Sequence, residues 1–282
     1  MSEATTIAFL GPSGTYSDEA ARLFAQKMGC ENPEYVECPS FNEVHAAVER
    51  GRCEFGVMPI ENSLEGVVTA TLDTLTFKGG VSIMGSAVLD IHHHLLLHPE
   101  ARIEDIKTIV SHPQALAQCR RYLNDAFPSI PRVTSSSTAE GASSASRDKT
   151  VAAIGSRFAG ELFGCKIAEE GIEDHFGNQT RFTLIARQGH EPVLTGDRMK
   201  TTLSLFLNAD RPGALLMILS ELNYANVNLT MLQSRPTKQG LGNYMFFLDL
   251  EGSPEEPAIK TALDCLRLKL REVKVLGTYP AE

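Results

Sequence analysis

Short apolar runs alternate with helical stretches over the first two-thirds of the chain, and this alternation restricts the fold more than any other feature. The expected strands cover residues 6–10, 34–38, 54–58, 81–89, 93–98, 106–110, 132–134, 151–154, 165–168 and 182–186. Several of the loops between them open a helix with Ser, Thr or Asn. Strand–loop–helix units of this kind predict an α/β fold with mixed, largely parallel sheets and helices on both faces.

The size of this region predicts a division into two parts. About 190 residues is large for a single sheet of this kind, so we expect two lobes with cores of their own. We place the first lobe at about 1–79 together with 178–190, and the second at about 80–177, because Gly79-Gly80 breaks the pattern. The strand at 182–186 then returns to the first lobe, which puts the loop before it at the hinge.

A different pattern follows residue 190, so we divide the chain into regions 1–190 and 200–282 with a polar linker between them. The second region has expected strands at 201–207, 227–234, 243–250 and 273–277, and expected helices at 210–224 and 255–270. The order β-α-β-β-α-β is that of the ferredoxin-like fold. A domain of this size usually needs a neighbour to cover its sheet, whereas we expect region 1–190 to fold without it.

Charge and cysteine content limit the possible partners and cofactors. The formal net charge of −9 argues against nucleic acid and anionic membranes. We see no signal peptide, and no stretch approaches the roughly 20 apolar residues of a spanning helix. Six cysteines without a CxxC pair suggest neither a zinc site nor disulfides, so we expect a cytoplasmic protein with no metal and no cofactor. His92 and His94 share a face if they lie on a strand, and a metal there stays open as the alternative.

A polar loop feeds the strand at 182–186. Residues 177–182 read Gly-Asn-Gln-Thr-Arg-Phe, which places a hydroxyl, a guanidinium and an aromatic ring side by side. Arg181 is suited to holding a carboxylate through two hydrogen bonds, and the Thr180 hydroxyl can donate to a leaving oxygen. The alternative is a turn with a surface arginine and a core Phe182, and this segment alone leaves it open.

Three further loops join an expected strand to an expected helix. They read Gly-Pro-Ser-Gly-Thr-Tyr-Ser at 11–17, Pro-Ile-Glu-Asn-Ser at 59–63 and Ser-His-Pro-Gln at 111–114. The first resembles an anion-binding corner, with Ser17 as the expected cap of its helix. Asn62 and Ser63 lie at the carboxyl end of a strand, where open α/β sheets bind ligands. Simple capping of the next helix is the alternative.

Together these motifs resemble the prephenate dehydratase family across nearly the whole chain. The residues that carry the resemblance are the loops at 11–17, 59–63 and 111–114, and Asn-Gln-Thr-Arg-Phe at 178–182. The tail is similar to the ACT regulatory domain of that family, through Arg-Pro-Gly-Ala-Leu at 211–215 and Ser-Arg-Pro at 234–236. One residue departs from the family pattern, because Gln233 stands where the family usually has Glu, and this bears on the effector response.

The resemblance implies a two-lobed catalytic region, like that of periplasmic binding proteins, and a single-activity lyase that makes phenylpyruvate from prephenate with loss of water and carbon dioxide. Thr180 would donate to the departing hydroxyl, Arg181 would hold a carboxylate, and Phe182 would face the ring or lie in the core. The implied substrate-binding residues are Thr15, Ser17, Asn62, Ser63, Ser111 and Gln114. Glu61 and His112 would either help them or only cap and pack.

The ACT resemblance further implies feedback regulation by L-phenylalanine, bound where two subunits of a homodimer or homotetramer meet. The implied effector-binding residues are Gly213, Ala214, Leu215, Asn226 and Asn228. Free backbone N–H groups at the start of the expected helix can receive the ligand carboxylate, and asparagine carbonyls can accept its ammonium. In the alternative, Gly213 only eases entry into the helix and the asparagines only shape a turn.

A second function class stays open for the chain. Two lobes with a small-anion site also fit a sensor that binds its ligand without turnover and signals through its tail. Product formation from prephenate distinguishes an enzyme from such a sensor.

Overall fold

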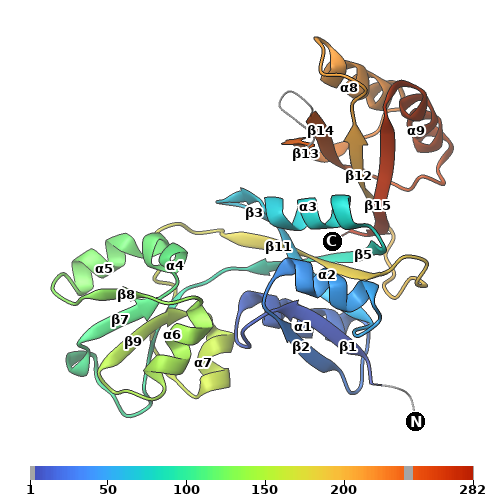
Figure 1. Ribbon diagram of the computed structural model, residues 1–282. Coiled ribbons are helices and arrows are strands. Elements are labelled where there is room, and N and C mark those ends of the chain that lie inside the picture. The colour runs from blue at the N-terminus through green and yellow to red at the C-terminus, as the bar shows by residue number, and fades with distance from the viewer. Residues whose placement is uncertain (1–3, 238–243, 282) are drawn as a thin grey trace.

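The computed structural model describes residues 4–237 and 244–281, which form two lobes and a C-terminal domain (Figure 1). The strands of the first lobe are β1 (Thr6–Leu10), β2 (Glu34–Cys38), β3 (Phe55–Asn62), β4 (Gly66–Val67), β5 (Val81–Asp90) and β11 (Gln179–Arg187). Their order is β2-β1-β3-β11-β5, with β4 paired to β3. β1 runs parallel to β2 and β3, whereas β11 lies antiparallel between β3 and β5.

Three helices cover this sheet: α1 (Tyr16–Lys27), α2 (Phe41–Glu49) and α3 (Thr69–Lys78). α1 packs Phe24 on one face, while α2 and α3 pack Val44 and Leu72 on the other. The cap of α1 is Thr15, whose Oγ1 accepts from the Asp18 N–H at 3.4 Å, so the prediction of Ser17 is wrong. Thr15 has the extended backbone that a cap requires, and Ser17 already lies in the first turn.

The boundary between the lobes differs from the expected one. β5 pairs with β11 from Val81 to Asp90, so the first lobe continues past Gly79-Gly80. These two glycines form the turn from α3 into β5, with φ values of 71° and 74° that favour glycine. The chain crosses to the second lobe at 91–93 and returns at 170–178. The loop before residue 182 was expected at the hinge between the lobes, and the returning segment at 170–178 lies there (Figure 1).

The second lobe has a five-stranded sheet in the order β10-β6-β9-β7-β8. Its strands are β6 (His94–Leu97), β7 (Thr108–Ser111), β8 (Arg132–Thr134), β9 (Val151–Gly155) and β10 (Lys166–Glu169). Its helices are α4 (Pro113–Gln118), α5 (Arg120–Ala126), α6 (Thr138–Ala145), α7 (Arg157–Phe163) and a 3-10 turn at Ile103–Asp105. β7 runs parallel to β8 and β9, so the carboxyl ends of these strands meet the first lobe with α4 and α6 beginning beside them.

The C-terminal domain has the expected β-α-β-β-α-β order. Its elements are β12 (Met199–Phe206), α8 (Ala214–Tyr224), β13 (Leu229–Pro236), β14 (Tyr244–Glu251), α9 (Pro257–Lys269) and β15 (Glu272–Pro280). The strands form an antiparallel sheet in the order β13-β14-β12-β15, and both helices pack on one face around Leu203 and Leu263. Asn243, the predicted first residue of the third strand, lies outside the described residues.

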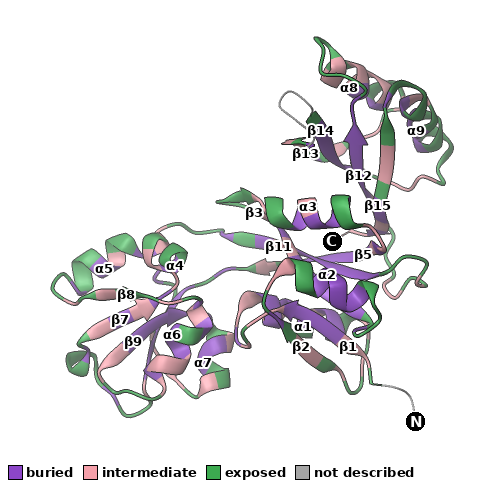
Figure 2. Cartoon of the chain, in the orientation of Figure 1, coloured by how far each residue is buried: buried purple, intermediate pink, exposed green. Residues whose placement is uncertain are grey.

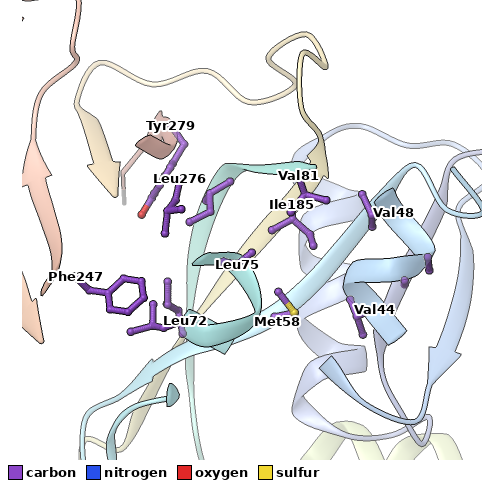
Figure 3. Close-up of a cluster of buried hydrophobic side chains, with 14 of the residues drawn as sticks. Val44, Val48, Met58, Leu72, Leu75, Val81, Ile185, Phe247, Leu276 and Tyr279 are labelled. Atoms are coloured by element: carbon purple, nitrogen blue, oxygen red, sulfur yellow. The ribbon is translucent and has the colours of Figure 1, made fainter. Parts of the chain in front are cut away.

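The other face of this sheet packs on the first lobe, so the core under α2 and α3 continues into the C-terminal domain. The buried residues of the core under α1 and of the cores of the second lobe all belong to region 1–190. One hydrophobic cluster contains Leu72 and Leu75 of α3 together with Phe247, Leu276 and Tyr279 of the C-terminal domain (Figure 3). Burying one such side chain fully stabilises a fold by about 1.5–3 kcal/mol. A Cβ at Gly277 would lie 2.3 Å from the Ile83 carbonyl oxygen, so glycine permits β15 to approach β5 closely.

Candidate active site

A cavity of about 280 Å³ lies between the two lobes, and both contribute side chains to it. The first lobe supplies Leu10, Gly11, Thr15, Tyr16, Ser17, Pro59 and Asn62, and the second supplies His112, Gln114, Ala115, Gln118, Ser136, Ser137 and Thr138. The crossing segments and β11 add Ile91, His93, Asn178, Thr180 and Phe182. Figure 2 shows β5 and β11 as largely buried, so the strand that carries Thr180 is held firmly in the sheet.

Three helix caps line this cavity. Thr15 caps α1, His112 caps α4, and Ser137 caps α6. The unpaired N–H groups and the positive dipole end of a helix favour anions. Among the described lining residues there is no lysine and no arginine, so neutral donors and helix ends supply the field that an anionic ligand would meet.

The hydrogen bonds around Asn62 fix the direction of the Thr180 hydroxyl. Asn62 Oδ1 accepts from the backbone N–H groups of Leu64 (3.0 Å) and Glu65 (2.9 Å). Its Nδ2 must therefore be the end that faces Thr180 Oγ1 at 2.8 Å, and it donates to that oxygen. Thr180 keeps its own proton for another acceptor, and its side chain lines the cavity.

The same orientation continues through a chain of side chains. Asn62 Nδ2 donates to Asn178 Oδ1 at 2.8 Å, so Asn178 turns its Nδ2 toward Gln118 Oε1 at 3.4 Å. Gln118 Oε1 also accepts from His93 Nε2 at 2.8 Å, which leaves Nδ1 of the neutral imidazole without a proton. Burial lowers the pKa of His93 and outweighs the opposing effects of Gln118 and Glu173.

Sequence reasoning did not select Gln118, His93 or Asn178 as site residues. Gln118 lies four residues after Gln114, so the two share a face of α4, and this spacing was a usable signal. His92 precedes β6 and is not on a strand, so the condition for a shared strand face is not met, although His92 and His94 both line another cavity beside Glu19 and Glu170. Within residues 4–237 and 244–281 no three potential metal ligands come together.

The remaining predicted residues divide into two groups. Thr15, Ser17, Asn62, Gln114, Thr180 and Phe182 line the cavity. Phe182 also packs in the core with Phe9, so it occupies the expected core position while it borders the cavity. Ser63 and Ser111 do not line the cavity. Ser63 donates to the Gly177 carbonyl and accepts from the Gln179 N–H, and the buried Ser111 donates to the Ile154 carbonyl.

Arg181 also does not line the cavity, so its predicted grip on a substrate carboxylate is wrong for this structure. Successive side chains of a strand point to opposite faces, and Thr180 and Phe182 take the cavity face. Arg181 Nη2 lies 2.6 Å from Asp249 Oδ2 of the C-terminal domain and 3.0 Å from Glu61 Oε2. Burial lowers the pKa of Arg181, but Asp249, Tyr279 and Glu61 outweigh burial and the pKa is raised.

A family model described as prephenate dehydratase matches residues 7–190, and one described as ACT domain matches residues 201–264. The chain belongs to the prephenate dehydratase family. The comparisons confirm the predicted family and the predicted two-lobed and ferredoxin-like folds. They also confirm the prediction of a hydro-lyase rather than a sensor. No helix in the described part of the chain is long and apolar enough to cross a membrane.

Relatives of this prephenate dehydratase family member cover almost its whole length. The prephenate dehydratase of Methanocaldococcus jannaschii is 38% identical over 95% of this chain and 96% of its own length. The crystal structure of the Arthrobacter aurescens prephenate dehydratase in complex with L-Phe is 35% identical, with a TM-score of 0.87, and the match covers 98% of this chain and 90% of that one. GqqA, described as a novel type of quorum quenching acylase, is 33% identical with a TM-score of 0.86, over 98% of both chains.

In the ACT domain, the predicted effector residues lie at the start of α8 and in the turn before β13. Gly213 caps α8 with φ 84°, and a Cβ there would meet nothing within 4 Å. Asn226 also has a positive φ, 54°, which asparagine tolerates better than most residues. Gly213 therefore borders open space next to the first N–H groups of a helix, as a carboxylate site requires.

Proposed function

We propose that this chain converts prephenate to phenylpyruvate in the inter-lobe cavity, with Thr180 as the donor to the leaving hydroxyl. The observation that carries this assignment is the Thr180 hydroxyl, which accepts from Asn62 and so has its proton free inside the cavity. The reaction breaks the bond from the ring to one carboxyl carbon, and its electron pair expels the ring hydroxyl. The prephenate dianion and one proton give phenylpyruvate, carbon dioxide and water.

The cavity suits this reaction because orientation and one donor are sufficient. Formation of an aromatic ring drives the fragmentation, so the protein has to hold the dianion and help hydroxide leave. The helix ends at Thr15, His112 and Ser137 supply hydrogen-bond donors for the two carboxylates. Ser17 and Gln114 complete the set, and Phe182 faces the ring. Both N–H bonds of Asn62 are engaged within the protein, so Asn62 contributes by directing the Thr180 hydroxyl.

Ser63 and Ser111 keep a supporting role in this proposal. Ser63 holds the loop before Thr180 through Gly177 and Gln179, and Ser111 joins β7 to β9 through Ile154. Both hydroxyls are engaged with backbone groups, so they shape the cavity walls and do not touch the substrate.

The similarity to a quorum quenching acylase raises a second candidate activity, hydrolysis of an acyl bond. Acyl transfer through a hydroxyl needs a base within hydrogen-bond reach of that hydroxyl. Thr180 is paired with an amide, and Thr15 Oγ1 donates to the Leu10 carbonyl at 3.3 Å. In the described lining no hydroxyl is hydrogen-bonded to a histidine side chain, since the Tyr16 hydroxyl donates to the backbone carbonyl of His92, so the geometry favours the dehydratase.

The proposal includes feedback by L-phenylalanine at the ACT domain, acting on a homodimer or homotetramer. The relative solved with L-Phe supports the ligand, and the open space beside Gly213, at the helix start that continues with Ala214 and Leu215, supports the place. Asn226 and Asn228 offer carbonyl oxygens to the ammonium. Subunit association is supported by the free edge of β13 and by exposed apolar side chains, Leu216, Tyr224 and Leu232.

We also place the enzyme in the cytoplasm. All six cysteines are free, although Cys38, Cys53 and Cys119 are buried and the others half-buried. Thiols that stay reduced are typical of a reducing compartment.

The decisive experiment is incubation of the full chain with prephenate while phenylpyruvate absorbance is followed, with and without L-phenylalanine. We expect product formation that phenylalanine inhibits. A thermal shift by prephenate without product would support the sensor and contradict the enzyme. Release of an acyl group from an N-acyl substrate, without product from prephenate, would support the acylase.

A Gly213→Val substitution tests the effector site. The bulk of valine at the helix start, and its poor tolerance of φ 84°, should raise the half-inhibitory phenylalanine concentration by about ten-fold or more, since one lost carboxylate contact is worth about 1.5–3 kcal/mol. Gly164→Val is the matched control, because Gly164 has φ 70° and open space but lies at the end of α7. If Gly213→Val and Gly164→Val have the same half-inhibitory phenylalanine concentration, the effector does not bind at Gly213.

A further inference from the structure

Arg181 is the residue that links β11 to the ACT domain through ion pairing. It makes ion pairs with Asp249 at 2.6 Å and with Glu61 at 3.0 Å. The Asp249 side chain is fully buried, whereas that of Glu61 is 39% exposed. Because charges interact more strongly away from water, Asp249 is the partner that determines where the guanidinium lies.

The ACT domain holds Asp249 in place from two further strands. Asp249 Oδ1 accepts from Thr202 Oγ1 at 2.7 Å, and that hydroxyl lies 2.8 Å from Tyr279 Oη. Arg181 Nη1 reaches the same Tyr279 oxygen at 3.5 Å. Asp249, Thr202 and Tyr279 come from β14, β12 and β15, so the grip on Arg181 belongs to the sheet as a whole.

The position of Arg181 is tied to that of Thr180 because the two are neighbours in one strand. Arg181 pairs with Glu61 and Phe182 pairs with Pro59, so Ile60 forms a bulge at this point of the ladder. Bulges are where a strand changes direction most easily. On the same side of the bulge as Arg181, Thr180 pairs with Asn62, the residue that orients its hydroxyl.

We propose that Asp249 of the ACT domain is a positioning residue for the dehydratase reaction. Its ion pair with Arg181 holds β11 in the position that presents the Thr180 hydroxyl to the substrate. L-Phenylalanine then inhibits by moving the ACT sheet so that Asp249 no longer holds Arg181. This inference rests on the proposed role of Thr180 and assigns the path by which the regulatory domain reaches it.

A second ion pair across the same interface provides a matched control. Arg235 of β13 lies 2.9 Å from Asp73 of α3, and both side chains are largely buried. This pair joins the ACT sheet to a helix and not to β11. Its loss should weaken the interface without displacing Thr180.

The test compares Asp249→Asn with Asp73→Asn in the full chain. The Asp249→Asn side chain would keep the acceptor for Thr202 but lose the charge that holds Arg181. We expect kcat to fall about ten-fold, the effect of a misplaced donor, with KM changed less than about two-fold. We expect the residual rate to be insensitive to phenylalanine, although calorimetry still detects its binding. Asp73→Asn should lower stability but keep the parent kcat within about two-fold, because its ion pair does not involve β11.

If Asp249 has a purely structural role, Asp249→Asn should lower the melting temperature, while kcat of the folded enzyme and its inhibition by phenylalanine should match those of Asp73→Asn. That result would overturn the proposal. If Asp249→Asn does not fold, Tyr279→Phe decides, because it removes one hydroxyl from the grip and keeps the ring in the core. We expect kcat of Tyr279→Phe to be several-fold lower than that of the parent. If this variant shows the parent kcat and the parent inhibition by phenylalanine, the proposal is overturned. A near-normal rate in Thr180→Ala would instead contradict the proposed role of Thr180, on which the inference about Asp249 rests.

Discussion

The two faces of β11 have different contents and different physical roles. One face carries Thr180, Phe182 and Leu184, which meet the cavity and the core under α1. The other carries Arg181 and Ile185, which meet the ACT domain and the core under α2. The polar side chain on the first face makes neutral hydrogen bonds, whereas the one on the second face makes buried ion pairs.

This difference predicts different consequences of mutation. A neutral hydrogen bond contributes about 0.5–1.5 kcal/mol to stability, so the cavity face can change with little effect on folding. Removing one partner of a buried ion pair costs about 3–5 kcal/mol, because the other charge is left without compensation. Changes at Thr180 should therefore alter rate more than stability, and changes at Arg181 should alter both.

Thr180→Ala should give the largest effect on rate. The variant loses the only donor assigned to the leaving hydroxyl, and one transition-state donor is worth about 2.7–4 kcal/mol, or roughly 10²–10³ in kcat. Its melting temperature should stay close to that of the parent. Thr180→Ser should recover much of the rate, since it restores the hydroxyl. If Thr180→Ala turns over like the parent, the cavity face of β11 has no chemical role in the reaction.

Arg181→Lys should give an intermediate effect and reports on the opposite face. Lysine keeps the charge but has no planar fork, so it cannot satisfy Asp249 and Glu61 together. We expect kcat to fall by about five-fold, a loss of about 1 kcal/mol, with KM unchanged. Steady-state kinetics would contradict the comparison if KM rose while kcat stayed constant, because that result would place Arg181 in the substrate site.

The error about Arg181 has a specific cause in the sequence. The expected strand began at Phe182, which left Thr180 and Arg181 in a loop where both can converge on a ligand. The strand begins at Gln179, so the alternation of a strand separates them. A shift of the boundary by a few residues is ordinary in such predictions, and here it reversed the face of one side chain.

Other features were accessible from the sequence to different degrees. The strand–loop–helix order and the ferredoxin-like tail followed from local patterns, and both are confirmed. The position of β5 beside β11 and the cluster of Leu72 with Phe247 depend on contacts between distant segments, which no local pattern records. Ser63 and Ser111 were polar residues in suitable loops, but only the structure shows that their hydroxyls serve the backbone.

The smallest expected effect is a pH dependence of stability that belongs to the cavity face. Burial lowers the pKa of His93 below its usual 6.5. Between the lowered value and about 6.5 the unfolded chain binds a proton that the folded chain does not, so stability falls as pH decreases through this range. The raised pKa of Arg181 keeps the ACT-facing guanidinium charged throughout, so it adds no slope there.

Urea unfolding at pH 7.5 and 5.5 measures this slope, and we compare the parent with His93→Gln and Arg181→Lys. Glutamine can still donate to Gln118 but does not titrate, so the loss of unfolding free energy on acidification should become smaller than in the parent. Burial also lowers the pKa values of His45 and His94, and these two residues should maintain part of the slope. Arg181→Lys should be less stable at both pH values yet show the parent slope. An undiminished slope in His93→Gln would mean that the pH dependence does not arise from His93 beside the cavity. A changed slope in Arg181→Lys would mean that the ACT-facing side of β11 contributes to it.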